Sequence, residues 1–114
     1  VVLSEENTIV PDLVFVSKEN RSIVKEKAIV GTPNLIVEVL SSNREHDLVY
    51  KKDLYETFGV PEYWIVDPNN KSLTIFFFDS KKKVYGDKKK FTDSDAVQSH
   101  VLYNLKLKVN EIFP

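Results

Sequence analysis

Residues 35–40 read Leu-Ile-Val-Glu-Val-Leu, so one carboxylate, Glu38, stands among five aliphatic side chains. The length of this run predicts a strand, and an apolar run without alternation is typical of a strand covered on both faces. An isolated carboxylate there is costly to ionise unless a cation, a metal ion or hydrogen-bond donors face it. Glu38 is therefore the first candidate functional residue.

The segments on either side of this run predict a turn before it and a helix after it. Residues 31–33 are Gly-Thr-Pro, which is turn chemistry. Ser42 and Glu45 have the Ser-x-x-Glu spacing of a capping box, which predicts a helix from about residue 43 to residue 58. Gly59 is then the expected residue that ends this helix in a left-handed conformation.

The remaining elements are mostly strands, and they complete the expected fold. Segments rich in β-forming residues, polar loops and lysine clusters alternate along the chain. We expect strands at 8–17, 62–67 and 72–79, short strands within 97–107, a loop or hairpin at 18–27, lysine clusters around a turn at 81–91 and a helical turn at 109–113. This order, β-β-α-β-β-β, predicts an α/β or α+β fold with a mixed sheet.

Composition sets the class of protein. The chain has 114 residues, 42% hydrophobic and 29% charged, which predicts one globular domain spanning residues 1–114. No apolar stretch reaches the ~20 residues of a membrane span. The absence of cysteine excludes disulfides, thiolate zinc sites and cysteine nucleophiles, and with the missing targeting signal it leads us to expect a cytoplasmic protein.

The charges nearly cancel, because 16 Lys and Arg face 17 Asp and Glu for a net charge of −1. This balance excludes a uniformly basic nucleic-acid binder and leaves room for a local basic patch. The lysine clusters at 81–83 and 88–90 are either a solvated hairpin or contacts to DNA phosphates. Three consecutive phenylalanines at 76–78 place aromatic rings on both faces of a strand, so one face packs inward and the other needs a cover. That cover is either a helix or a second subunit, and a second subunit would make a homodimer.

Two further residues break the hydrophobic pattern. Asp12 interrupts the apolar residues 9–16, and by the two-residue period of a strand it shares a face with Val10, Val14 and Val16. Lys51 falls near the middle of an arc of apolar helix positions, at ~100° per residue. A lysine there needs a partner, and the helix can pack back over the Glu38 strand. Arg44 and Asp47 fall on the same side, in the first turn.

These residues allow a catalytic and a structural interpretation. Two buried carboxylates on strands, Asp12 and Glu38, offer the oxygen ligands that Mg²⁺ or Mn²⁺ prefers. Together with Lys51, such a metal ion activates water and stabilises charge on a phosphate. The structural interpretation is a buried Glu38–Lys51 ion pair, with Asp12 as a strand-end or turn carboxylate. The pattern alone does not choose between them.

Four blocks, in order and spacing, cover most of the chain from about residue 10 to residue 113. They are Pro-Asp-Leu-Val at 11–14, residues 31–41, the set Arg44, Asp47 and Lys51, and residues 59–68. Together they resemble the Uma-two family of restriction endonucleases, which is similar to the PD-(D/E)XK nuclease superfamily. The resemblance implies a restriction-endonuclease-like mixed sheet flanked by helices.

The same resemblance implies a metal-dependent endonuclease that hydrolyses DNA phosphodiester bonds. Asp12 and Glu38 would be the ligands of Mg²⁺ or Mn²⁺, and Arg44 would contact the scissile phosphate. The superfamily often places its lysine two residues after the glutamate, where this chain has Leu40, so Lys51 on the following helix would take that role.

The sequence departs from the family pattern in two places. Asn34 stands where relatives often have aspartate. The family normally has an upstream helical and hairpin region, whereas this chain begins at Val1 and has no methionine, so we expect an N-terminal element to be missing. Loss of that element favours an alternative, a catalytically inactive module of the same fold that serves DNA binding or protein assembly.

Overall fold

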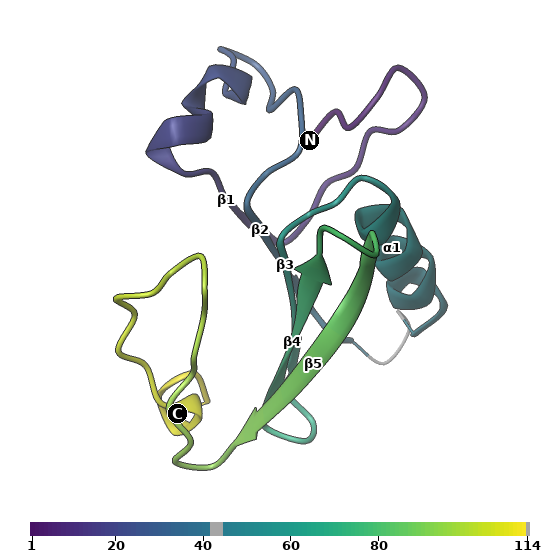
Figure 1. The fold of residues 1–114 in the computed structure, drawn as a ribbon. Helices are drawn as coiled ribbons and strands as arrows, with labels where there is room; N and C mark the ends of the chain where they lie inside the picture. The colour runs from purple at the N-terminus through teal and green to yellow at the C-terminus, as the bar shows by residue number, and fades with distance from the viewer. Residues whose placement is uncertain (42–44, 114) are drawn as a thin grey trace.

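The computed structural model describes residues 1–41 and 45–113, except for the side chains of residues 45–47. In these residues a five-stranded sheet carries an α-helix on one face (Figure 1). The strands are β1 (Leu13–Phe15), β2 (Leu35–Val39), β3 (Glu62–Asp67), β4 (Ser72–Asp79) and β5 (Val84–Thr92), and the helices are α1 (Glu45–Thr57) and the short 3₁₀ helices η1 (Lys18–Ile23) and η2 (Val109–Glu111). The expected class, a mixed sheet in an α/β or α+β fold, is confirmed.

The strands lie in the sheet in chain order, β1-β2-β3-β4-β5. β2 and β3 are parallel, and the other neighbours are antiparallel. Parallel strands need a crossover connection of a dozen residues or more, and α1 supplies it. The register aligns Glu38 with Ile65, Ile65 with Thr74 and Thr74 with Lys90, so these four residues form one row across the sheet.

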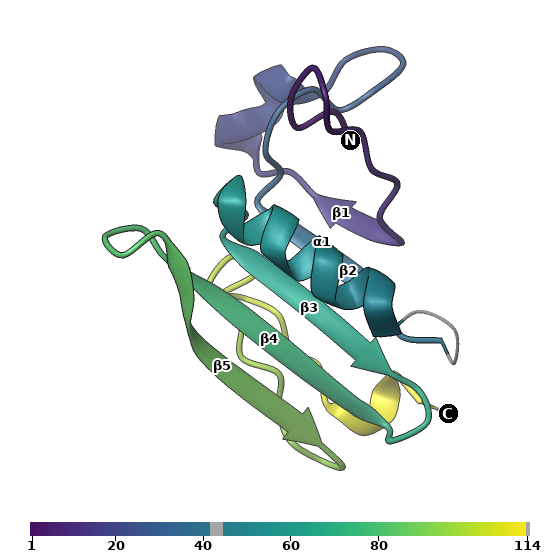
Figure 2. The same cartoon turned by 90° about the vertical axis from the view of Figure 1, so that its right-hand side faces the viewer.

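Both faces of the central strands are covered, as the apolar run at 35–40 predicts. Figure 2 shows α1 lying over β2 and β3 on one face. Tyr55 of α1 packs there against Tyr63, edge to face, with ring centres 5.0 Å apart. The C-terminal segment after β5 covers the opposite face, where Val97 and Val109 join the core with Trp64. No helix in the described parts of the chain is long and apolar enough to cross a membrane.

Glu62 fastens the C-terminal segment to the sheet. This carboxylate is only 1% exposed and begins β3 on the face opposite α1. Its Oε1 accepts hydrogen bonds from Trp64 Nε1 at 3.0 Å and Ser99 Oγ at 2.8 Å. Its Oε2 accepts from the backbone N–H groups of His100 at 2.7 Å and Val101 at 2.6 Å. Four donors therefore satisfy a carboxylate that no solvent reaches.

The short strands expected within 97–107 are not formed in the structure, which corrects that prediction. The segment makes an isolated bridge between Ala96 and Lys108 and otherwise runs irregularly. Its backbone donors at 100 and 101 bind the Glu62 side chain, so they are not available to a strand ladder. The helical turn expected at 109–113 is confirmed as η2.

Other boundaries differ from the sequence-based expectations for local reasons. β1 is three residues long because Pro11 has no N–H for the ladder before it and the Asn34 side chain binds the Ser17 N–H after it. Residues 18–23 form a 3₁₀ helix in place of a loop, and the lysines at 88–90 lie within β5 and not around a turn. Ser42 and Asn43 lie outside the described residues, so the capping box is untested.

The far end of α1 is tied to the start of β5. Gly59 ends the helix with a positive φ of 68°, as expected from sequence. Glu56 accepts a hydrogen bond from the Tyr85 N–H at 2.8 Å, and the Tyr85 hydroxyl donates to the Val60 carbonyl at 2.9 Å. Burial, with the nearby charges of Tyr63 and Glu56, raises the pKa of the Tyr85 phenol far above its ordinary value. Tyr85 is therefore a neutral hydrogen-bond donor.

Glu62→Gln tests the role of this buried carboxylate. The amide replaces an acceptor oxygen by a donor among four donors, so the free energy of unfolding falls by about 2–3 kcal/mol. Urea unfolding followed by the fluorescence of Trp64, the one tryptophan, measures the loss. The exposed Glu26→Gln is the matched control and stays within about 0.5 kcal/mol of wild type. Equal losses in the two variants would contradict this role.

Candidate active site

Glu38 lies under α1 and is 0% exposed. Side chains alternate along β2, so Glu38 shares the α1 face with Ile36. Lys51 Nζ donates to Glu38 Oε2 at 2.7 Å, and the lysine side chain is 12% exposed. The prediction that Lys51 lies on the buried side of its helix and meets a partner there is confirmed.

Asp12 joins this pair from the residue just before β1. Its backbone N–H donates to Glu38 Oε1 at 3.2 Å, and its Oδ2 accepts from the Val39 N–H at 2.7 Å. The antiparallel register pairs Leu13 with Val37, and one step further it brings Asp12 opposite Glu38. The two bonds run in opposite directions, so each segment orients the carboxylate of the other.

Asp12 is exposed, which corrects the expectation of a second buried carboxylate. It precedes the paired part of the strand, where solvent reaches its side chain. The site thus combines one buried carboxylate, one exposed carboxylate and one lysine, held by three different elements. It is open to solvent on the Asp12 side.

The other residues singled out from the sequence lie elsewhere or outside the described part. Arg44 is not among the described residues, nor is the side chain of Asp47. Asn34 lies at the opposite end of β2 from the site, where its Oδ1 accepts from the Ser17 N–H at 2.9 Å and from Asn20 Nδ2 at 3.3 Å. Asn34 therefore holds η1 in place and is not part of the site.

The donor chemistry of the site fits a hard divalent cation. Asp12 and Glu38 supply carboxylate oxygens, and Mg²⁺ usually binds one or two protein carboxylates while waters and substrate phosphates complete its shell. Groups of three or more His, Cys, Asp or Glu that could hold a metal ion do not occur among the described residues. A cation here would compete with the Lys51 ammonium for Glu38 Oε2, because that oxygen is 2.7 Å from Nζ.

The sequence analysis missed the backbone donors of the site and the buried carboxylate of Glu62 on the other face of the sheet. The N–H groups of Asp12 and Val39 hold the site, and no sequence pattern identifies them. Glu62 was detectable, because the two-residue period places it on the face of Trp64 and Val66 in an apolar strand.

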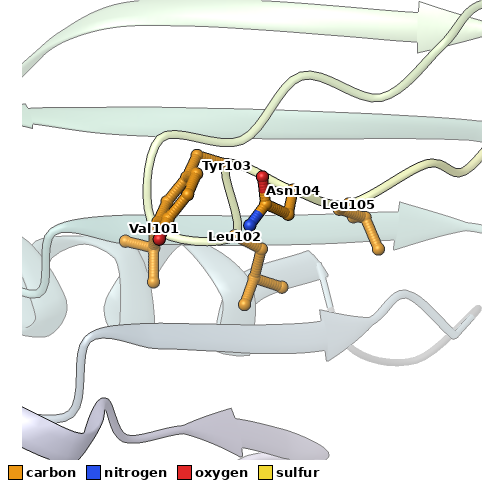
Figure 3. A pocket seen from close by; sticks show the side chains of 5 residues that line it. All are labelled: Val101, Leu102, Tyr103, Asn104 and Leu105. Atoms are coloured by element: carbon orange, nitrogen blue, oxygen red, sulfur yellow. The ribbon is translucent and has the colours of Figure 1, made fainter.

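An apolar cavity of about 270 Å³, lined by residues 101–105, lies in the C-terminal segment and thus on the other face of the sheet from Glu38 (Figure 3).

Lys51→Met tests the energetic coupling of the pair. Removing the ammonium leaves Glu38 buried without its cation, so the free energy of unfolding falls by about 3–5 kcal/mol. Adding Glu38→Gln to this variant recovers at least about 1 kcal/mol in urea unfolding. Lys52→Met is the matched control on the next helix residue and loses no more than about 1 kcal/mol. Additive losses in the double variant would show that the two side chains are not coupled.

Comparison with known proteins places this geometry in a family. The model of the Uma2 (Uma-two) family, described as "Putative restriction endonuclease", matches residues 1–110. No curated protein sequence matches the chain. Among solved structures, the chain is similar to a "putative nuclease belonging to DUF820" from Anabaena variabilis, with a TM-score of 0.70 and 17% sequence identity.

That alignment covers 92% of this chain and 59% of the Anabaena chain, so this chain spans about three-fifths of its length. At 17% identity the likeness concerns the fold, and it supports the mixed-sheet architecture described above. The family match extends over nearly the whole chain, including the segments that carry Asp12, Glu38 and Lys51. The chain belongs to the Uma2 family.

Proposed function

We propose that residues 1–114 form one endonuclease domain that hydrolyses DNA phosphodiester bonds with the help of Mg²⁺ or Mn²⁺. One observation carries the proposal: Lys51 Nζ and the Asp12 backbone N–H both bind the Glu38 carboxylate, and the next residue of β2, Val39, binds the Asp12 carboxylate through its N–H. Membership of a family described as restriction endonucleases supports DNA as the substrate. Two carboxylates beside one lysine are the groups that phosphodiester hydrolysis needs.

Each side chain has a distinct role in this proposal. Asp12 and Glu38 would hold the divalent cation, which when bound stabilises charge on the phosphate and makes a water molecule more acidic. Asp12 is exposed and is the carboxylate that an incoming phosphate meets first. Lys51 orients the attacking water by donating a hydrogen bond, and its charge stabilises the oxyanion that develops on the phosphate. Arg44 would steady the scissile phosphate.

The backbone donors make the site rigid before substrate arrives. The Asp12 N–H fixes one oxygen of Glu38, and the Val39 N–H fixes one oxygen of Asp12. Preorganised groups lose little orientational freedom when the reaction begins, which is how such sites accelerate chemistry. This geometry therefore favours a site for a small charged group over a flexible surface cluster.

A second candidate function rests on the buried ion pair between Glu38 and Lys51. Glu38 is 0% exposed, and each of its oxygens already has a donor. A neutralised pair of this kind also suits an inactive endonuclease-fold module for DNA binding or protein assembly, as a monomer or a homodimer. The two functions differ in whether Asp12 and Glu38 take up a cation.

Asp12→Asn separates the two functions with little effect on folding, because this side chain is exposed. We expect calorimetric titration with Mn²⁺ to show binding to wild type and none to the variant. Plasmid nicking in Mn²⁺ falls at least about 100-fold, which corresponds to about 2.7 kcal/mol of transition-state stabilisation.

Asp53→Asn, an exposed aspartate on α1, is the matched control and keeps both metal binding and nicking. Wild-type protein that binds no Mn²⁺ and does not nick DNA would contradict the nuclease and favour the inactive module. Nicking that survives Asp12→Asn would place the catalytic residues elsewhere.

A further inference from the structure

The three consecutive lysines of β5 divide between the two faces of the sheet. Lys88 pairs with Phe76 and Lys90 with Thr74, whereas Lys89 pairs with Ile75 of the C-terminal core. Because side chains alternate along a strand, Lys88 and Lys90 share the α1 face with Glu38, and Lys89 lies on the opposite face. The solvated hairpin suggested by the sequence therefore has two chemically different sides.

A lysine from α1 extends this charge toward the helix. Figure 2 shows that α1 lies over β2 and β3, while its far end reaches the start of β5, where Glu56 binds Tyr85. Lys52 Nζ lies 5.2 Å from the centre of the Phe76 ring, and Lys88 Nζ lies 5.9 Å from it. Two ammonium groups thus converge on one half-buried ring, with Lys90 next along the strand. We call Lys52, Lys88 and Lys90 the lysine strip.

The acidic and titratable groups around the strip do not neutralise it. Glu56, one turn after Lys52 on α1, is one carboxylate beside three lysines and accepts the Tyr85 N–H, and burial keeps Tyr85 neutral by raising its pKa. Asp87 pairs with Phe77 and so lies on the other face, and Asp53 is exposed on α1. Within the described part of the chain, no ion pair involves any of the three lysines. The strip therefore presents net positive charge to solvent.

The strip lies at a defined distance from the candidate site. Lys90 and Glu38 occupy the same row of the sheet, three strands apart. Strands are spaced by about 4.8 Å, so the backbones of Lys90 and Glu38 are about 14 Å apart, and that of Asp12, one strand further on, is about 19 Å from Lys90. α1 lies above β2 and β3, between the exposed Asp12 and the strip. The major groove of B-form DNA is about 12 Å wide and admits an α-helix. One duplex can therefore reach both sides of α1.

We propose that a DNA duplex lies across α1, with the backbone of one strand at the exposed Asp12 side of the candidate site and the backbone of the other strand on the lysine strip. This inference rests on the proposed nuclease function for the position of the cleaved strand. Lysine ammonium groups contact phosphates without reading sequence, so the strip supplies affinity and orientation. The exposed residues Val49 and Tyr50 of α1 then face the groove.

The test is the salt dependence of DNA binding, measured without cleavage. Fluorescence anisotropy follows a labelled duplex of about 20 base pairs in EDTA at several KCl concentrations. The strip variant is Lys52→Gln/Lys88→Gln/Lys90→Gln. The control is Lys81→Gln/Lys82→Gln/Lys89→Gln, which removes the same charge from the same region but from outside the strip.

We expect the strip variant to reduce the slope of log affinity against log salt by about 2.7, since each phosphate contact contributes about 0.9. The control keeps the wild-type slope within about 0.9. Circular dichroism melting checks that each variant is folded. The single variants Lys90→Gln and Lys89→Gln repeat the comparison with one charge removed from each. We expect the slope to change by about 0.9 in Lys90→Gln alone.

Equal slopes in the two triple variants, or no duplex binding by wild type, would overturn the proposal that the lysine strip binds DNA. These outcomes are independent of catalysis, because the assay contains no divalent metal. A smaller salt slope in the strip variant, in a protein that does not nick DNA, would support DNA binding by the strip and contradict the proposed nuclease function. Nicking that depends on Asp12, with equal slopes in the triple variants, would contradict the strip alone.

Discussion

The contact between Lys51 Nζ and Glu38 Oε2, at 2.7 Å, sets how α1 sits on the sheet. A carboxylate with no exposure requires a cation or donors, so the helix can dock only in a rotation that turns Lys51 inward. Tyr55, one turn further on, then meets Tyr63, and Lys52, one residue on, points toward Phe76. The core beneath α1, the candidate site and the position of Lys52 in the lysine strip follow from this rotation.

The sheet holds a buried carboxylate on each face, and their partners differ in kind. Glu62 is bound by fixed neutral donors from Trp64, Ser99 and two backbone N–H groups. The donors of Ser99, His100 and Val101 cannot leave Glu62 without unfolding the C-terminal segment, so Glu62 holds that segment on the sheet. Glu38 instead has a flexible lysine and lies beside the exposed Asp12. An ammonium on a flexible side chain can yield its place to another cation, and this difference favours function at Glu38.

Much of the fold was predictable because local signals and tertiary contacts agree. The strands at 62–67 and 72–79 have the predicted boundaries, and Gly59 ends the helix as expected. The prediction for 97–107 was wrong because a distant side chain, Glu62, takes the backbone donors of that segment. Strand β5 was missed because lysines at 88–90 have little intrinsic preference for strands, and pairing with β4 decides their conformation.

Part of the site was predictable from local sequence patterns. Glu38 and Lys51 break two periodic patterns, and a break in a buried face is visible in sequence. The exposure of Asp12 was not visible, because it depends on where pairing with β2 begins. The family match raises the weight of the catalytic interpretation, while the roles of Asp12, Glu38, Lys51 and Arg44 remain proposals.

Anomalous diffraction from crystals soaked in Mn²⁺ tests the central claim most directly, because it locates the metal ion and shows the lysine together. The account predicts a peak about 2.1 Å from carboxylate oxygens of Asp12 and Glu38, with Lys51 Nζ moved away from Glu38 Oε2. Crystals without a peak there, with the 2.7 Å contact between Lys51 and Glu38 intact, would contradict it and leave a structural ion pair.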